Sequence, residues 1–503
     1  MKRTVLLVSL VAAAAATTSA FAPRAHACDD HQANDPNAKL RGKPGTAEDA
    51  AGGKDSGPLD RLPIRVERLE NGLTVVMSSD RTVPTVAVVV YYNVGSRNEV
   101  RGRSGFAHLF EHMMFQGSAN VKKGEHFRLV ENRGGDMNGT TSEDRTNYYE
   151  TMPSNELALA LWLEADRMKS LEVSQANFEN QRQVVMEERR QSYGNRPYML
   201  SFLRINELAY GDYFPYAHST IGDMRDLENA PLSAVQEFFN TYYTPSNAVL
   251  SIAGDFDPAE ALALANRYFG AIKSHDVPAF TPGELLPQTA ERADVIVDPL
   301  AELPAFHVTY HIPPNRSADH YAIEMLAMIL GDGQSSRLYQ KLVKQSEICQ
   351  SINVSTDDRR GQDLFSVFGV LAAGKKSEDA RKAIFAELES IQKNGVTERE
   401  LEKTKNGVRA AFVFGLESNM SRAMQLAEYQ MYWGDASLIR GEPARYLAVT
   451  NDDIKRVAAQ YFPAANRTVL DVVPAAAVAP AAAPPAPATP ASDKAAPAAK
   501  GTK

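Results

Sequence analysis

The sequence predicts an α+β protein built from two similar units, and three observations support this. Its 503 residues, 44% hydrophobic and 23% charged, can form two or more cores rather than one. Two stretches of comparable length, 59–273 and 291–474, are separated by a linker, 274–290, that is punctuated by Pro. Both stretches open with strand-like apolar runs and then turn helical, as two duplicated units would.

The elements expected in the two units follow the same order. In the first unit we expect strands at 73–77 and 85–91, a helix through 108–112, a helix over 155–167 and a strand over 248–253. In the second unit we expect strands at 293–297 and 305–310 and a helix over 320–330. Strands and helices interleave in both, as expected where helices pack on sheets.

The N-terminal 27 residues are typical of a secretory signal peptide. Lys2 and Arg3 precede an apolar stretch over 5–16, and Ala25-His26-Ala27 provides small residues for cleavage. Cys28 would then be the first mature residue, and a lipid anchor there is an open alternative, although Ala25 stands where lipoprotein signals usually carry Leu. We therefore expect an exported, periplasmic protein.

Both ends of the mature chain have the composition of flexible segments. Residues 28–58 are polar and rich in Gly, Asp and Lys, which predicts a flexible leader. Residues 475–503 are almost entirely Ala and Pro with a few Lys, which predicts a disordered tail.

Charge and composition exclude several classes of protein. The net charge of -8 and the lack of a long Lys/Arg tract argue against nucleic acid as a partner. No segment after the signal peptide has the roughly 20 uninterrupted apolar residues of a transmembrane helix. The only cysteines are Cys28 and Cys349, too few for a disulfide framework. Small molecules and peptides remain as the expected partners.

The run His108-Leu-Phe-Glu-His112 is the most informative motif. Residues three and four apart share a face of a helix, so His108, Glu111 and His112 can converge on one point. We expect a helix of about three turns, capped by Ser104 and stopped near Gly117. Its other residues are largely apolar, so the three polar side chains are expected to be buried and to need partners, which a divalent metal would supply. The alternative is that two core histidines and a glutamate coincide by chance.

A catalytic zinc site normally takes three protein ligands, so a further ligand is needed. The best candidate is Glu188, in the helical segment 180–190, because Val184 and Val185 mark the expected buried side and Glu188 projects between them. Glu187 is expected to point about a quarter turn away. A solvated Glu/Arg face is the alternative for this segment. The helix expected at 320–330 carries Glu324 but no paired histidines, so the second unit is expected to lack a metal site.

Taken together, these motifs resemble the pitrilysin family of zinc metallopeptidases, whose inverted zincin signature is H-x-x-E-H. The resemblance covers about Arg65 to Val473 and is closest to bacterial two-domain subunits related to mitochondrial processing peptidase. Glu188 matches the family's third ligand in spacing and pattern. Weaker matches occur in the right order: they are 134–141 with Tyr148-Tyr149, 214–216 with Ile221-Gly222, 242–248 with 254–258, and 335–339.

The resemblance implies a fold and an activity. The fold is two α/β sandwich-like domains, each a mostly antiparallel sheet packed with helices, which together form half of a clam-shell. The activity is zinc-dependent hydrolysis of extended peptides by an endopeptidase, with one Zn²⁺ per chain held by His108, His112 and Glu188. Glu111 would be the general base that takes the proton of the attacking water.

The same resemblance suggests where substrate binds. The segment 134–141 resembles the family's edge strand beside the metal, to which a peptide adds by backbone hydrogen bonds, with Asn138, Gly139 and Thr140 as candidates. A Gly-rich hairpin that serves only the sheet is the alternative.

Two departures from the family pattern matter. Gln181 stands where many relatives have a Glu, seven residues before the third ligand. Val343 and Gln350 stand where active assemblies carry an Arg and a Tyr that contact substrate, and a shift of one residue offers only Lys344. We therefore expect a heterodimer in which a homologous subunit supplies the Arg/Tyr pair. The alternatives are a non-catalytic peptide-binding or assembly subunit, and a hydrolase of small non-peptide substrates.

Overall fold

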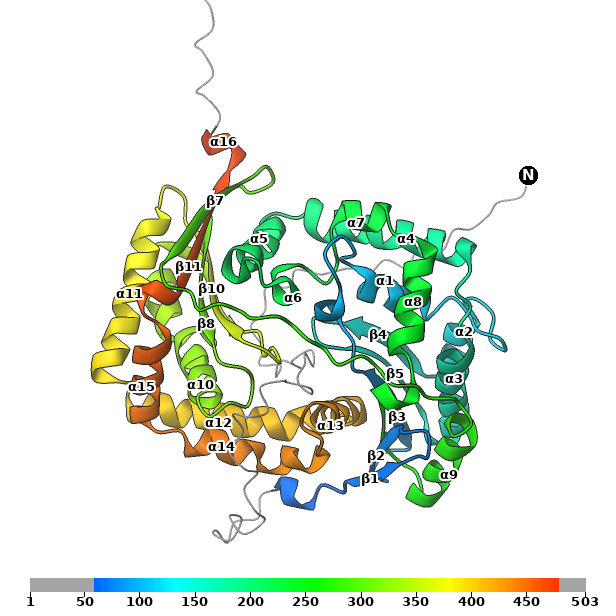
Figure 1. The fold of residues 1–503 in the computed structure, drawn as a ribbon. Helices are drawn as coiled ribbons and strands as arrows, with labels where there is room; N and C mark the ends of the chain where they lie inside the picture. Colours follow the sequence, from blue (N-terminus) through cyan, green and yellow to red (C-terminus); the bar gives the residue numbers. More distant parts are fainter. Residues whose placement is uncertain (1–57, 479–503) are drawn as a thin grey trace, which may run out of the picture.

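The structure is a computed structural model that describes residues 58–478 as two lobes, each a sheet covered by helices (Figure 1). The expected signal peptide, Cys28, nearly all of the leader and most of the tail lie outside these residues. Pro58–Arg61 forms a short 3-10 helix at the end of the expected leader. Ala475–Val478 is a short helix, α16, directly after the last strand, and the rest of the expected tail lies outside the described residues.

The first sheet has six strands in the order β1-β2-β6-β3-β5-β4. Neighbours are antiparallel except β2 and β6, which are parallel. Strand β4 therefore forms one edge of the sheet. The bounds are β1 (Arg65–Arg68), β2 (Thr74–Ser79), β3 (Thr85–Tyr92), β4 (Asp136–Thr141), β5 (Thr146–Pro153) and β6 (Ala248–Gly254).

The second sheet repeats the topology of the first. Its five strands run β7-β11-β8-β10-β9, and only β7 and β11 are parallel. Each strand has a counterpart in the same place of the first sheet, with β7 matching β2, β11 matching β6, β8 matching β3, β10 matching β5 and β9 matching β4. The bounds are β7 (Arg292–Asp298), β8 (Ala305–Ile312), β9 (Cys349–Thr356), β10 (Asp363–Leu371) and β11 (Arg467–Pro474). The predicted duplication and the mostly antiparallel α+β fold are confirmed.

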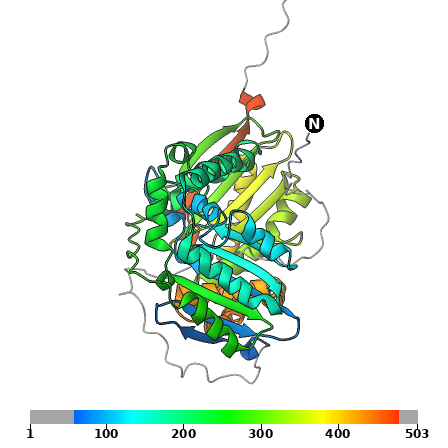
Figure 2. The same ribbon diagram turned by 90° about the vertical axis from the view of Figure 1, so that its right-hand side faces the viewer.

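Strand β3 is apolar on both faces because both faces of the first sheet are covered. Val86, Val88 and Val90 point into the core beneath the helices of the first lobe, and Ala87 and Val89 point to the other side. Figure 2 looks onto the helices that cover this sheet from outside. The helices in the first half of the chain are α1 (Phe106–Met113), α2 (Glu125–Glu131), α3 (Leu157–Ser170), α4 (Gln175–Arg189), α5 (Met199–Tyr210), α6 (Phe214–Ala217), α7 (Met224–Glu228), α8 (Leu232–Tyr242) and α9 (Pro258–Phe269).

The second half has its own core, built mainly from its sheet and the helices α10, α11 and α15. In position along the chain, α10 follows β8 as α1 follows β3, so α10 is the counterpart of α1. The remaining helices are α10 (His320–Gly331), α11 (Ser377–Asn394), α12 (Glu398–Gly415), α13 (Asn419–Trp433), α14 (Glu442–Ala448) and α15 (Asn451–Tyr461).

Each half places one helix on the sheet of the other. Helix α13 packs against β3 and β6, where Leu426 and Tyr432 are buried in the same cluster as Val89 (Figure 1). Helix α5 packs against β7, β8 and β11. There Ser201 Oγ lies 2.7 Å from His307 Nε2. In residues 270–291, all of which the structure describes, there is no helix or strand, as expected of a linker. The two units are therefore separate in sequence but interlocked in space.

Candidate metal centre

Helix α1, which carries the H-x-x-E-H motif, starts and ends differently from the prediction. It spans Phe106–Met113, about two turns rather than three, and therefore ends before Gly117. Ser104 does not cap it, because the hydroxyl of Ser104 donates to Asp226 Oδ2 at 2.6 Å. The first backbone N–H groups instead donate to the carboxylate of Glu99, from Gly105 at 2.8 Å and from Ala107 at 2.7 Å. A buried carboxylate satisfies these groups and also suits the positive end of the helix dipole.

The segment around Gly222 fixes the position of both helices that carry the motif and Glu188. Gly105 has φ +85°, and a Cβ there would lie 2.9 Å from Gly222 Cα, so the start of α1 is held against this backbone. On α4, Arg189 donates to the carbonyl of Gly222 at 2.7 Å. Because Arg189 follows Glu188, one loop aligns α1 and α4 with each other.

Helix α4 presents Glu188 to α1 and Glu187 to solvent. Ser174 caps the helix by accepting from the N–H of Asn177 at 3.4 Å, and Val185 is buried. Val184 is 43% exposed, so the prediction that it marks the buried side was wrong. The buried side of α4 includes the consecutive pairs Asn177–Phe178 and Val185–Met186, and Val184 lies just outside it. Glu187 pairs with Arg190, as expected for a residue turned away from the site.

The three predicted ligands converge. His112 Nε2 lies 3.3 Å from Glu188 Oε2, and His108 Nε2 lies 3.8 Å from Glu188 Oε1. The two imidazole rings stand at 83° with centroids 4.8 Å apart. Two imidazole nitrogens and a carboxylate at these separations are the donor set of a zinc site with one position left open. The residues present therefore fit zinc.

The electrostatics of these residues suit a metal. Burial, and then the neighbouring His112, lower the pKa of His108 to about 4, so this imidazole is neutral and has a lone pair available. Burial also acts to lower the pKa of His112, but the hydrogen bond with Glu188 and the negative charges of Glu111 and Glu188 together outweigh it, and the pKa rises. For Glu188, burial acts to raise the pKa, and the contacts with His112 and His108 lower it overall. Glu188 is therefore ionised near neutral pH.

Gln181, which departs from the family pattern, is buried and interacts with the metal centre. Its side chain hydrogen-bonds His112 and so favours one orientation of that ring. The Gln181 amide can orient the His112 ring without adding negative charge to the metal centre.

Glu111 is buried on the same helix and is held by a residue that the sequence analysis missed. Thr141 Oγ1 donates to Glu111 Oε2 at 2.6 Å. Burial raises the pKa of Glu111, while this hydrogen bond and the charge of His112 act against the rise. Thr141 belongs to the segment 134–141 that was singled out, but nothing in the sequence shows that its side chain faces α1.

The predicted substrate-binding residues lie on β4, which is an edge strand as expected. The N–H of Ser142 donates to the carbonyl of Arg145 at 3.0 Å, so the backbone groups of Ser142 face β5. In an antiparallel pair every second residue faces the partner strand, so Thr140 and Asn138 also face β5. The backbone groups of Gly139, which lies between them, point outwards. Gly139 also faces α1, since a Cβ there would lie 3.2 Å from Glu111 Cγ. The open edge therefore runs past Glu111.

The two positions where the family carries its Arg and Tyr lie in the second half. Val343, in the turn of helix Tyr339–Gln345, packs against the core of the second half. Gln350 is exposed on β9.

Comparison with known proteins agrees with this architecture. Residues 74–213 match the family described as insulinase, peptidase family M16, and residues 230–408 match the peptidase M16 inactive domain. A zinc protease from Helicobacter pylori, PqqE, is 33% identical over 415 residues, which cover 81% of this chain and 92% of that protein. The chain belongs to peptidase family M16. The resemblance drawn from H-x-x-E-H is thereby confirmed.

Solved structures show the same M16 fold. A protease from Helicobacter pylori superposes with a TM-score of 0.79 at 31% identity, covering 82% of this chain and all of the other. The periplasmic protease PqqL from Escherichia coli superposes with a TM-score of 0.67 at 18% identity, and the match covers 83% of this chain but 48% of PqqL. Among residues 58–478, no helix is long and apolar enough to cross a membrane.

Proposed function

We propose that the chain is a zinc-dependent endopeptidase that hydrolyses extended peptides. The observation that carries this proposal is the convergence of His108, His112 and Glu188, with Glu111 directly before His112 on α1 and hydrogen-bonded by Thr141. A subunit that had lost its peptidase activity would have no chemical need for all of the metal ligands together with the general base. The names of the relatives as zinc proteases support the same activity.

The residues have distinct tasks in this mechanism. His108, His112 and Glu188 would hold zinc, which supplies a Lewis acid that acidifies water and polarises the scissile carbonyl. Glu111 accepts the proton of the attacking water and passes it to the leaving amine. Thr141 aims the Glu111 carboxylate. Burial on α1 keeps bulk water away from the Glu111 carboxylate, and the electrostatic interactions of this carboxylate are therefore stronger than in water.

We propose that substrate binds as an added strand on β4. The outward carbonyl of Gly139 can pair with an extended peptide, as can its N–H once this group leaves Asn138 Oδ1, to which it donates at 2.9 Å, and the carbonyl of the peptide then runs past Glu111. Asn138 and Thr140 would contribute through side chains on the other face. Because backbone groups dominate such binding, flexible segments should be preferred over folded proteins.

We also propose that the active enzyme is a heterodimer. Val343 packs into the core of the second half and Gln350 is exposed on β9, so neither provides the Arg or the Tyr that the family resemblance calls for near the metal. A homologous subunit that carries this pair would complete the site. Export to the periplasm is part of the proposal, because the basic and apolar start of the sequence is that of a signal peptide.

Glu111→Gln tests the catalytic assignment. The variant should bind as much zinc per chain as the wild type, yet lose about 10²–10⁴-fold in peptide turnover, because the amide cannot accept a proton. Glu187→Gln on α4 is the matched control and should behave as wild type. Retained turnover in Glu111→Gln would overturn the mechanism. Absence of stoichiometric zinc from the wild type would favour a non-catalytic subunit.

Purification tests the heterodimer. Alone, the chain should bind zinc and cleave unstructured peptides poorly, and a homologous subunit with the Arg/Tyr pair should raise cleavage and co-elute with it. Full activity of the chain alone would contradict this part of the proposal and leave the zinc mechanism standing.

A further inference from the structure

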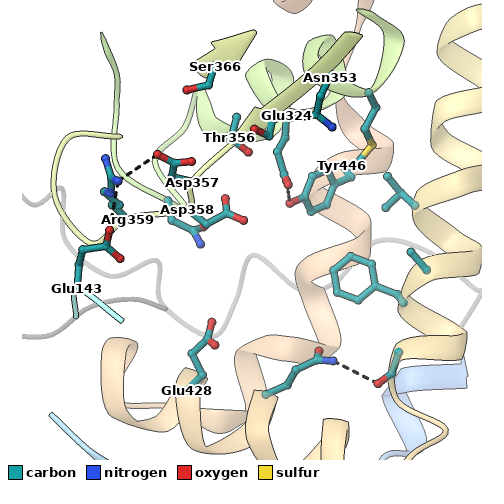
Figure 3. A pocket seen from close by; sticks show the side chains of 18 of the residues that line it. Glu143, Glu324, Asn353, Thr356, Asp357, Asp358, Arg359, Ser366, Glu428 and Tyr446 are labelled. Carbon is teal, nitrogen blue, oxygen red and sulfur yellow. Dashed lines mark hydrogen bonds and ion pairs between the residues drawn. The ribbon is translucent and has the colours of Figure 1, made fainter. Parts of the chain in front are cut away.

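A cavity of about 700 Å³ lies between the two lobes, away from the H-x-x-E-H residues (Figure 3). Its lining includes the tip of the β4–β5 hairpin, α5, α12, α13 and the β9–β10 hairpin, and in the described chain it does not include His108, Glu111, His112 or Glu188. Acidic side chains are prominent on its wall, among them Glu143, Glu324, Asp357, Asp358 and Glu428.

One group on this wall has the geometry of a metal site. His320 is the first residue of α10, Glu324 lies one turn further along, and Asp358 follows β9 in the hairpin turn. His320 Nε2 lies 3.5 Å from Glu324 Oε2 and 3.9 Å from Asp358 Oδ1. The corresponding separations at the first site are 3.3 and 3.8 Å. In both groups all ligand atoms lie within 4.8 Å of one another, and α10 is the counterpart of α1 in the duplicated fold.

Two buried atoms of this group have no hydrogen-bond partner among the described residues. The side chain of His320 is only 3% exposed, its Nε2 faces both carboxylates, and its Nδ1 has no hydrogen-bond partner among residues 58–478. Asp358 Oδ1 is also buried without a hydrogen bond from the described chain. A buried imidazole and a buried carboxylate oxygen left in this way are costly unless a further group satisfies them. Glu324 is held in place by the hydroxyl of Tyr446.

The charges around the group favour a cation. The carboxylates of Glu324, Asp363 and Glu428 lie close enough to Asp358 to repel it when all are ionised. The neighbouring cation, Arg359, is already paired with Asp357 at 3.2 Å and Glu143 at 3.3 Å. A divalent cation bound by Asp358 and Glu324 would relieve this repulsion.

We propose that His320, Glu324 and Asp358 form a second metal site, which takes a divalent transition-metal cation such as Zn²⁺ or Mn²⁺. One imidazole and two carboxylates are ligands that these ions accept, and a site with three protein ligands leaves positions open towards the cavity. Glu324 and Asp358 line the cavity, so the ion has a path to the site.

A comparable group elsewhere in the described chain also has donor atoms without hydrogen-bond partners, His126 Nε2 and both carboxylate oxygens of Glu150, but it differs in charge and in access to the cavity. His126, Glu150 and Glu164 also lie close together, but all three are buried and Arg167 is paired with Glu164. Positive charge is therefore already present, and this group does not line the cavity. We expect two metal ions per chain rather than three.

Metal binding can be measured with the first site removed, so the result does not depend on the proposed peptidase activity. The full chain carrying His108→Ala and His112→Ala is stripped with a chelator, titrated with Zn²⁺ and separately with Mn²⁺ by calorimetry, and assayed for metal content after gel filtration. It should retain one ion per chain. Adding Asp358→Asn should weaken binding by about 100-fold or more, since loss of an outer hydrogen-bonding partner alone costs about 10–100-fold.

Asp357→Asn is the matched control, because Asp357 is the next residue in the same turn and lines the same cavity while pairing with Arg359. It should leave the affinity unchanged. Glu324→Gln provides an independent ligand variant of the same shape, and circular dichroism checks that each variant is folded. The proposal is overturned if the double histidine variant binds no ion, or if Asp357→Asn weakens binding as much as Asp358→Asn.

Discussion

Thr141→Val should impair the general base while leaving the metal ligands intact. The hydroxyl of Thr141 donates to Glu111 Oε2 at 2.6 Å, a length typical of a hydrogen bond to a carboxylate. Such bonds contribute about 1.5–3 kcal/mol. If this contribution is expressed in the transition state, kcat falls roughly 10–150-fold, since each 1.36 kcal/mol is tenfold. KM should change little, because the hydroxyl points to Glu111 and not to the open edge.

The same variant should shift the pH dependence. Glu111 must be ionised to accept a proton. Its pKa is raised by burial and held back by the Thr141 hydrogen bond. Without that bond the pKa of Glu111 rises further, so the acidic limb of kcat/KM moves to higher pH and the loss of activity is greatest at low pH.

The assay is steady-state cleavage of a quenched fluorescent peptide across pH, with zinc content measured on the same samples. Thr141→Ser keeps the hydroxyl and should retain most activity. Thr140→Val is the control for the acidic limb, because the hydroxyl of Thr140 donates to Asn147 Oδ1 at 2.6 Å and not to Glu111; the limb should stay unshifted, and any contribution of Thr140 to substrate binding should appear in KM. Wild-type kcat and an unshifted acidic limb in Thr141→Val would refute the reasoning.

Three further changes test other parts of the structure. Gln181→Ala removes the side chain that orients His112 and should weaken zinc affinity by about 10–100-fold in a competition titration with a chelator, whereas Gln183→Ala, on the same helix, should not. Gly139→Ala places a Cβ 3.0 Å from the Tyr148 ring and 3.2 Å from Glu111 Cγ. Because this contact displaces Glu111, kcat should drop by up to about 10²-fold with zinc still bound. An unchanged kcat would show that β4 can shift to accommodate the methyl group without displacing Glu111. Leu426→Ala, in the core between α13 and the first sheet, should lower the free energy of unfolding by about 2–5 kcal/mol. Denaturant unfolding followed by fluorescence and by circular dichroism should show one coincident transition. Separate transitions for the two lobes would contradict the interlocked packing.

The periodic elements could be predicted from the sequence because local pattern determines them. The strand expected at 85–91 is β3 (Thr85–Tyr92), and the helix expected at 320–330 is α10 (His320–Gly331). Duplication could be predicted for the same reason, since two runs of elements in one order leave a repeated pattern.

Features that depend on distant segments could not be predicted. Ser104 has a residue type that caps helices, but its hydroxyl is taken by Asp226, and the carboxylate of Glu99 does the capping instead. Thr141 reaches Glu111 only because β4 lies beside α1. The second group of metal donors escaped notice because it pairs His320 and Glu324 with Asp358, which comes from a separate hairpin, whereas sequence motifs are sought on one helix.

Because α5 packs on the second sheet and α13 packs on the first, the two halves of the chain are expected to move together as one rigid unit. Bending at residues 270–291 would pull α13 away from β3 and α5 away from β8, so the chain has no easy internal hinge. If the active enzyme encloses peptides between two such chains, the enclosure opens only where the chains meet. The dwell time of a captured peptide would then follow the lifetime of the dimer, and dilution of the protein, rather than flexing of either chain, would release it.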